Sequence, residues 1–465
     1  MTDDQSEIHR SQTASRAFLY SRTEKEKPDA PAEAPAEAPA DTDGQAAAEQ
    51  QTPADLSVTR HFPQAVTNEP ALMEAAMAHL ADVSQFSAIV IRVDDIHNLV
   101  DPDAVIGDTA AVIDALCNSA DGLWGMVEAH IFGCFLPDHD EAACRSAADS
   151  IKQKLAERRS QTVTIGIAEY PTLEYDKSAI LTNAKKALDH AEFFGPDSCV
   201  AFDAVSLNIS GDQYYQAGDI DAAIEEFKLA LRLDPQNINV HNSLGVCYGV
   251  KGELDNALSA FQTVIDLHPE DPMALYNAGY VHMLKGDPET ALRFFQHAGR
   301  LDGDIFELNF QTGRVLLEQG KPDAAKPYIE HAVGLQPDSG AAYRYLGDCY
   351  AAAGQTDDAV NAYKTALKRR PEDAAAISAL GYCYERQGQN AEIALMFARQ
   401  ATDMEPENGL FHFRLGWIYY NRNEPENALA AFESARECGY DGQSYIEKTR
   451  KLMADAAEGR SARQS

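Results

Sequence analysis

The sequence predicts a two-part fold, an α/β domain followed by an all-α solenoid, and three observations support this prediction. Strand-like and helix-like segments alternate over residues 61–203, which indicates a sheet covered by helices. Over residues 204–442, small, aromatic and proline residues recur every 34 positions, which indicates stacked helical hairpins. Residues 1–60 contain PAEAPAEAPA and lack the large apolar groups that a core needs, so they predict a disordered, acidic, Pro/Ala-rich tail.

The charge balance excludes several classes of partner. Lys and Arg number 39 and Asp and Glu 73, so the formal net charge of the 465 residues is −34. Such a surface repels phosphate backbones and anionic lipid, so neither nucleic acid nor a membrane is expected as a partner. The start of the chain, MTDDQSEIHR, has no apolar core and does not read as a secretory signal. We therefore expect a cytoplasmic protein.

The cysteines argue against a metal or disulfide framework. The eight cysteines are scattered and include no CxxC pair, so they are expected to be small buried residues in a reducing compartment. His130, His139, Asp138 and Asp140 offer one alternative, a metal cluster. Their spacing fits no tetrahedral motif well, so a strand residue followed by an acidic helix start explains them better. No cofactor and no metal site are predicted.

The elements of the α/β domain follow from local patterns. Apolar residues at helical spacing predict helices over 71–83, 109–120, 140–159 and 178–195. Runs of β-branched residues predict strands over 87–93 and 162–171. The stretch GMVEAHIFGCFLP at 125–137 predicts two short strands around a turn.

Residues 85–203 resemble a GGDEF domain, the diguanylate cyclase family. VTIGIAEYP (163–171) is similar to a late strand of that family, and AKKALDHAEFFGPDS (184–198) is similar to its last helix. IFGCFLP fits the strand that follows the family signature. The resemblance therefore places the five signature positions on EAHIF, residues Glu128, Ala129, His130, Ile131 and Phe132, of which only the phenylalanine is kept.

The changes from this family pattern predict that the domain is not an enzyme. The resemblance places the metal-binding aspartate on Arg92, which would repel a cation, and the phosphate-contacting lysine on Glu192. No Arg or Lys lies between Arg92 and Arg145, so the inhibitory RxxD site is also missing. Asp94 and Asp108 survive as residual nucleotide-site candidates. Whether they still bind a nucleotide is left open by the sequence.

The 34-residue pattern is the strongest signal in the chain. Ala223, Phe227, Ala230 and Pro235 form its first set of anchors, and the pattern recurs in register. A glycine precedes each set at a fixed offset: Gly211, Gly245, Gly279, Gly313, Gly347, Gly381 and Gly416. Small residues let two helices approach, and the proline ends the second helix. Residues 204–442 resemble seven tetratricopeptide repeats (TPR), with a capping helix and tail over 443–465.

In this family the first helix of each repeat lines a concave groove. The register places aromatic and arginine side chains there, which is the composition of binding hot spots. Packing between adjacent repeats is the alternative explanation for the aromatic residues. The predicted groove residues are Tyr276, Tyr280, Phe310, Arg314, Arg344, Tyr345, Tyr382, Arg386, Phe413, Arg414, Trp417 and Tyr420.

The sequence as a whole favours a non-catalytic scaffold, and the resemblance to the cyclase family implies a bacterial origin. The repeats are expected to bind a protein or peptide partner, with an acidic or carboxylate-bearing peptide best suited to the arginines. The degenerate domain is expected to act as a docking or regulatory module and to offer a surface for a homodimer. The alternative is a nucleotide sensor or a divergent diguanylate cyclase.

Overall fold

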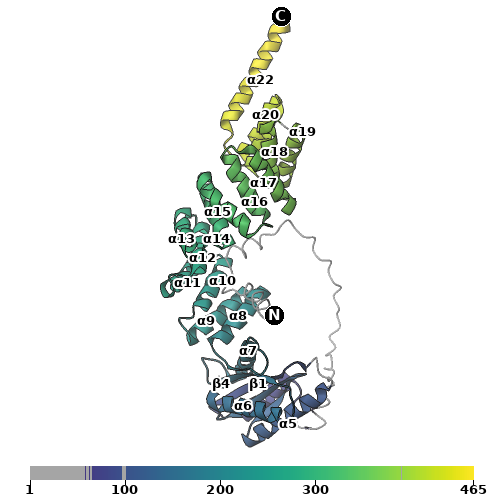
Figure 1. The fold of residues 1–465 in the computed structure, drawn as a ribbon, viewed down its shortest axis with the longest axis vertical. Coiled ribbons are helices and arrows are strands. Elements are labelled where there is room, and N and C mark those ends of the chain that lie inside the picture. The colour runs from purple at the N-terminus through teal and green to yellow at the C-terminus, as the bar shows by residue number, and fades with distance from the viewer. Residues whose placement is uncertain (1–57, 59–61, 63–64, 97–100, 389, 465) are drawn as a thin grey trace. The chain divides into compact units, whose positions relative to one another are not determined.

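The computed structural model describes residues 58, 62, 65–96, 101–388 and 390–464, with side chains described as far as residue 455 (Figure 1). The predicted tail over residues 1–60 lies outside this part of the chain, apart from Val58. The chain divides into two compact units, Met1–Pro269 and Glu270–Ser465. The first unit contains a sheet with its helices and two helical hairpins. The second contains five further hairpins and a long C-terminal helix.

Strands and helices alternate in the first unit as predicted. The elements are α4 (Glu69–His79), β1 (Phe86–Val93), α5 (Pro102–Ser119), β2 (Leu123–Glu128), β3 (Ile131–Pro137), α6 (Glu141–Ala156), β4 (Val163–Tyr170), α7 (Ile180–Glu192) and β5 (Cys199–Ala201). The hairpin predicted over 125–137 is confirmed by β2 and β3. The short strand β5 was not predicted, because three residues are too few to show a strand period.

Polar caps set where the helices of this domain begin. The side chain of Asp101 accepts the backbone N–H of Ala104 at 3.1 Å, and Pro102 occupies the first helical position. Helix α5 therefore starts seven residues before the predicted residue 109. Asp140 caps α6 in the same way, at 2.8 Å from the N–H of Ala143.

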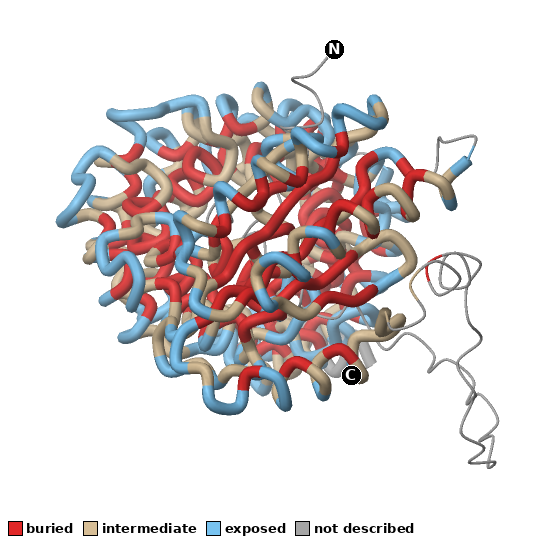
Figure 2. Tube along the Cα trace, turned by 90° about the horizontal axis from the view of Figure 1, so that it is seen from below, coloured by how far each residue is buried: buried red, intermediate tan, exposed pale blue. Residues whose placement is uncertain are grey.

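One five-stranded sheet forms the centre of the α/β domain, in the order β2-β3-β1-β4-β5. The middle strand β1 pairs antiparallel with both β3 and β4, and β5 pairs parallel with β4. Alternate residues of β1 enter two cores: Ile89 and Ile91 pack with α5 and α6, whereas Ala88 and Val90 pack with α4 and α7. With helices on both faces, the central strands are almost wholly buried (Figure 2).

The α/β domain is fastened to the first helical hairpin, α8 (Ala204–Ala217) and α9 (Ile220–Leu233). Lys186 of α7 contacts both carboxylate oxygens of Glu226 of α9 at 2.7 Å, and both side chains are largely buried. His190 of α7 lies 3.3 Å from Asp203, which caps α8. Burial opposes ionisation of Asp203, but His190 and Ser206 together lower the pKa of its carboxyl. The sheet domain thus packs against the first hairpin through α7.

Fourteen helices follow the sheet in seven pairs, and the predicted helical hairpins are confirmed. After α8 and α9 they are α10 (Ile238–Val250), α11 (Leu254–Leu267), α12 (Pro272–Leu284), α13 (Pro288–Leu301), α14 (Phe306–Glu318), α15 (Pro322–Leu335), α16 (Gly340–Ala352), α17 (Thr356–Arg369), α18 (Ala374–Gln387), α19 (Ala391–Met404), α20 (Gly409–Asn421) and α21 (Pro425–Glu437). Helix α22 (Gln443–Gln464) ends the described chain.

The repeated glycines bring the two helices of each pair together. A Cβ atom placed on Gly211 would lie 2.4 Å from the Phe227 ring, and one on Gly347 would lie 2.5 Å from the Tyr363 ring. The glycine on the first helix therefore leaves space for the large side chain sixteen positions later on the second helix. This contact explains why the small and aromatic positions recur in register.

Candidate partner-binding site

The hairpin tip of the α/β domain carries the five positions on which the sequence analysis places the signature, residues 128–132. Glu128 ends β2 and is exposed, Ala129 and His130 form the turn, and Ile131 begins β3. Phe132 is fully buried and packs against Trp124 with ring centres 6.2 Å apart. The one signature residue that is kept is therefore a core residue.

Two side chains whose charges are opposite to those of the cyclase pattern form an ion pair with each other. Arg92 near the end of β1 forms an ion pair with Glu192 at the end of α7. In the resemblance these are the metal-binding aspartate and the phosphate-contacting lysine, respectively. The inverted charges form an internal ion pair.

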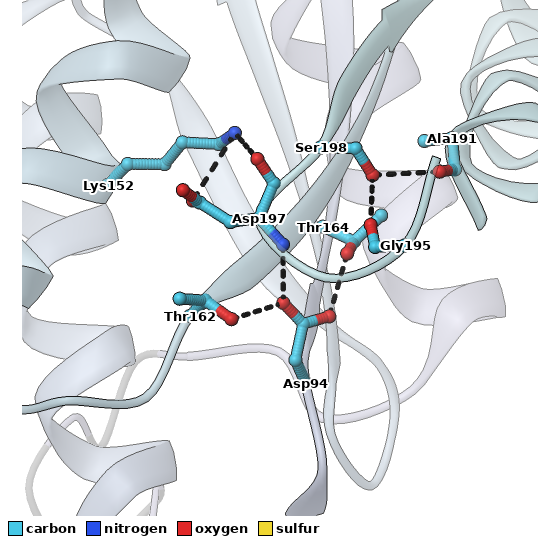
Figure 3. A network of polar contacts seen from close by, with 8 residues as sticks. All are labelled: Asp94, Lys152, Thr162, Thr164, Ala191, Gly195, Asp197 and Ser198. Atoms are coloured by element: carbon cyan, nitrogen blue, oxygen red, sulfur yellow. Dashed lines mark hydrogen bonds and ion pairs between the residues drawn. The ribbon is translucent and has the colours of Figure 1, made fainter. Parts of the chain in front are cut away.

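Asp94, the first residual nucleotide-site candidate, lies just after β1 and is almost fully buried. Its carboxylate accepts hydrogen bonds from the hydroxyls of Thr162 and Thr164, both at 2.7 Å, and from the backbone N–H of Asp197 at 3.0 Å (Figure 3). Lys152 in turn lies 3.4 Å from the Asp197 carboxylate. Asp94 therefore joins the end of β1 to the start of β4 and to the loop before β5.

Asp108, the second candidate, lies on α5 and forms ion pairs with Arg159 and, at 3.9 Å, with Arg158. Two residues of the alternative metal cluster, His139 and Asp140, contact other groups instead. His139 contacts the carbonyl of Pro137 at 2.6 Å, and Asp140 is used as the cap of α6. Among the described residues no three His, Cys, Asp or Glu side chains come together as metal ligands.

The first helices of the hairpins carry the predicted groove residues, but three of these are buried. Tyr276 packs on Phe295 with ring centres 5.5 Å apart and stacks with Tyr280 at 6.2 Å. Phe310 lies 5.3 Å from Tyr345 in an edge-on contact. The exposed fractions of Tyr276, Tyr280 and Phe310 are 0%, 3% and 1%. The prediction that they face a partner is corrected: they fill the space between helices.

Two further predicted groove residues contact the C-terminal helix. Phe413 of α20 lies 5.4 Å from the ring of Tyr445 of α22 and 4.9 Å from Tyr440. Tyr420 lies 5.9 Å from Tyr445. Both side chains are half-buried and help to hold the cap on the last hairpin.

The predicted arginines differ in their partners. Arg344 lies 3.2 Å from Asp373 and 3.7 Å from Asp348, with its guanidinium 4.1 Å from the Tyr345 ring centre. Burial opposes its charge, but Tyr345 and the two carboxylates raise the pKa of Arg344. Arg314 lies 3.6 Å from Glu318 and donates to the sulfur of Met283. These two arginines are already balanced within the chain.

Arg386 and Arg414 are in a different position. Arg386 is exposed near the end of α18, and Arg414 of α20 donates to the hydroxyl of Ser378 at 3.2 Å. Within the part of the chain that the structure describes, neither guanidinium has a carboxylate at ion-pair distance. Both line a pocket of about 230 Å³ between α16, α17, α18 and α20. Tyr382 also lines it and packs on Trp417 with ring centres 4.7 Å apart.

A second hollow, of about 870 Å³, has the opposite character. Loops around Glu405–Leu410 and Cys438–Tyr440 line it, and its charged groups are Glu405 and Glu407. It holds no lysine or arginine. An acidic ligand would be repelled there, so of these two hollows the smaller suits the predicted acidic peptide.

Sequence reasoning missed the carboxylates that balance the arginines. Asp348 lies one helical turn after Arg344, a spacing that predicts an ion pair and was available from the sequence. Asp373 caps α18, so its nearness to Arg344 depends on how adjacent hairpins stack. Tyr363 of α17 donates to Asp348 at 2.8 Å, a contact that no local spacing reveals.

Comparison with known families covers most of the helical region. Family models described as "Tetratricopeptide repeat" match residues 248–304, 316–380, 351–392 and 393–441, and one described as "TPR repeat" matches 211–249. The helical hairpins are tetratricopeptide repeats. None of these matches falls within residues 1–210, so they leave the α/β domain unassigned. A search of curated proteins finds no match.

Several solved structures are similar to part of this chain. A tetratricopeptide repeat protein from Parabacteroides merdae is 19% identical, covers 54% of this chain and 98% of its own length, and has a TM-score of 0.40. YrrB, described as a TPR protein with an unusual peptide-binding site, is 26% identical over 40% of this chain and 96% of its own, with a TM-score of 0.37. Pseudomonas aeruginosa pilF is 20% identical over 44% and 92%, with a TM-score of 0.40.

None of the helices among the described residues is long and apolar enough to cross a membrane.

Proposed function

We propose that the protein is a non-catalytic interaction scaffold whose last TPR repeats bind a peptide or protein partner. One observation carries the proposal. Tyr382 and Trp417 are half-buried on the first helices of consecutive repeats, next to Arg386 and Arg414, which lack carboxylate partners among the described residues. Aromatic side chains and arginine at one place form the residue set that dominates protein interfaces.

For the α/β domain we propose a degenerate, cyclase-like module with a docking or regulatory role, including a surface for a homodimer. Its support is the placement of the signature positions at a hairpin tip and the ion pair between Arg92 and Glu192. Nucleotide sensing or divergent cyclase activity would require Asp94 and Asp108 to give up internal partners. Breaking three hydrogen bonds to a buried carboxylate is costly, which disfavours both alternatives.

Partner capture tests the scaffold proposal. The full chain is the reagent, because the sheet domain packs on the first hairpin through Lys186 and Glu226. We expect immobilised wild-type protein to retain a partner from native lysate. The double variant Trp417→Ala and Arg386→Ala should not retain it. The matched control is Arg300→Ala, an exposed arginine on the second helix of another repeat. Equal capture by all three proteins would contradict the proposed site.

Catalysis is tested separately with purified full chain, GTP and Mg²⁺. We expect no cyclic dinucleotide beyond the amount formed by a heat-denatured sample. A product that disappears in the Asp94→Asn variant would contradict the non-catalytic proposal and restore the cyclase alternative.

A further inference from the structure

The pocket between α16, α17, α18 and α20 has the size of a subsite. At about 230 Å³ it falls below the roughly 300–1,000 Å³ that is typical of small-molecule sites. Its walls come from two consecutive first helices and from the second helix between them, with Arg414 added from the next repeat. A pocket of this size suits one or two groups of a longer ligand better than a complete small molecule.

The charges in the pocket do not cancel one another locally. The one carboxylate in its wall, Asp348, accepts a hydrogen bond from Tyr363 at 2.8 Å and lies 3.7 Å from Arg344, outside the pocket wall. Arg344 also pairs with Asp373, and Arg414 interacts electrostatically with the Asp348 carboxylate. The pocket wall still holds two guanidiniums and one carboxylate, a positive excess in a chain whose net charge is −34.

The two arginines are suited to a planar anion. A guanidinium is charged at all physiological pH values and presents several N–H donors in a fixed fork. Arg414 uses one donor on Ser378, and its guanidinium lies 5.8 Å from the Tyr382 ring centre, which restricts its orientation. Arg386 is exposed at the rim. A carboxylate held between two such groups would make charge-assisted hydrogen bonds to both.

An apolar surface adjoins these charges. Tyr382 forms part of the wall and Trp417 packs against it, and both remain half-buried. A ligand residue next to the bound carboxylate would therefore meet aromatic rings. This arrangement favours a peptide over an isolated inorganic anion, which would gain nothing from the rings.

We propose that this pocket is a carboxylate subsite for a peptide, in which Arg386 and Arg414 bind the carboxylate and the Tyr382–Trp417 pair contacts the adjacent apolar residue. The carboxylate comes from a glutamate or aspartate side chain or from the free C-terminus of the peptide. This inference rests on the proposed function, because it assigns a chemistry to one part of the same partner-binding site.

The test uses immobilised 12-residue peptides with random flanking positions and a fixed centre, probed with labelled full-length protein. One pool has a Leu-Glu centre and an amidated C-terminus, and its neutral counterpart has Leu-Gln. A third has Leu-Gln with a free C-terminal carboxylate, and a fourth has Leu-phosphoserine with an amide. We expect at least one carboxylate pool to retain roughly tenfold more protein than the neutral pool, the effect of about one charge-assisted contact.

Arginine variants complete the test. Arg386→Gln, at an exposed position, should remove most of the preference for the carboxylate pools, whereas the matched Arg300→Gln should leave it unchanged. Preference for the glutamate pool assigns the subsite to a side chain, and preference for the free-terminus pool assigns it to a chain end. Either supports the proposal.

Three outcomes would overturn it. They are equal retention of the charged and neutral pools, stronger retention of the phosphoserine pool than of both carboxylate pools, and no retention of any pool by wild-type protein. The scaffold proposal is decided separately, by partner capture with the double variant Trp417→Ala and Arg386→Ala. Suppose that the variant fails to retain the partner but wild-type protein shows no preference for the carboxylate pools. The scaffold proposal would then hold, and only the carboxylate subsite would be rejected.

Discussion

The end of β1 in the α/β domain and the pocket in the repeats both contain charged side chains, but these side chains have different partners. Asp94 receives three hydrogen bonds from the chain, and Arg92 pairs with Glu192. In the pocket, Arg386 and Arg414 have no carboxylate partner within the described residues. A charged residue near a surface thus indicates a ligand only when the chain itself does not satisfy it.

The comparison accords with our proposal, in which polar groups in the first region stabilise the fold and those in the second bind a partner. Each region carries its own reporter, since the two tryptophans of the chain are Trp124 in the α/β domain and Trp417 in the repeats. Trp417→Phe leaves a signal from the first region alone, and Trp124→Phe leaves one from the second. The following variants are made in whichever background reports on their region.

The largest effect is expected from Asp94→Ala. The change leaves the buried Thr164 hydroxyl, the half-buried Thr162 hydroxyl and one backbone N–H without their acceptor, so we expect the free energy of unfolding of the α/β domain to fall by about 3 kcal/mol. Urea denaturation followed by Trp124 fluorescence measures it. The exposed Asp82→Ala is the control and should change stability by less than about 0.5 kcal/mol. Similar losses from both variants would remove the structural role given to Asp94.

The next effect concerns the joint between the sheet domain and the first repeat. Lys186→Met leaves the largely buried carboxylate of Glu226 without its cation. We expect the free energy of unfolding, measured by Trp124 fluorescence in urea, to fall by about 2 kcal/mol. Adding Glu226→Leu removes the stranded charge and should recover most of that loss. If the double variant is as unstable as the single one, the ion pair is not what fastens the joint.

A smaller effect on stability distinguishes Arg344, which has carboxylate partners, from Arg386, which has no carboxylate at ion-pair distance among the described residues. Arg344→Gln removes contacts with Asp348 and Asp373 and should cost about 1 kcal/mol, read from Trp417 fluorescence in urea. Arg386→Gln should change stability by less than about 0.5 kcal/mol, because the native state loses no ion pair. Stability loss from Arg386→Gln equal to that from Arg344→Gln would show that Arg386 has a structural role, against its assignment to a ligand.

The smallest effect is a pH dependence. Burial, the main cause, raises the pKa of Asp348 above its ordinary value of 3.8, although Arg344 and Tyr363 oppose the rise. The native state therefore binds this proton more tightly than the unfolded state does, and the stability this provides at low pH is lost as the pH rises above 3.8 through the folded pKa. We therefore measure the free energy of unfolding by urea denaturation between pH 4 and 7. The part of its decline with rising pH that comes from Asp348 should be missing in Asp348→Asn and present in the exposed control Asp323→Asn. Identical pH profiles for wild type and Asp348→Asn would contradict the raised pKa.

Most of the architecture could be predicted because it depends on local periods. The 34-residue recurrence predicts the seven helical hairpins, and Gly347 facing Tyr363 shows the contact that maintains it. The alternation of strands and helices predicts the sheet domain, including the hairpin of β2 and β3. Helix α5 starts earlier than the apolar pattern indicates, because Asp101 and Pro102 rather than apolar residues set its beginning.

The candidate site could be predicted only in part. Helical register alone placed Tyr276, Tyr280 and Phe310 on the same face as Tyr382, yet the first three are buried and Tyr382 is not. Register gives the direction in which a side chain leaves its helix. It does not give the distance to the next hairpin, which decides whether that side chain is covered.

Apart from the short strand β5, the sequence by itself therefore determined which of these elements form, in what order, and which residue types face the first-helix side of the repeats. Only the tertiary structure decided which charges are satisfied. Arg92 meets Glu192 across 100 positions of sequence, and Arg344 meets Asp373 of the next repeat, whereas neither Arg386 nor Arg414 has a carboxylate at ion-pair distance among the described residues. The physical reason is that ion pairs act over a few ångströms, and such distances between elements are set by packing rather than by any repeating pattern in the chain.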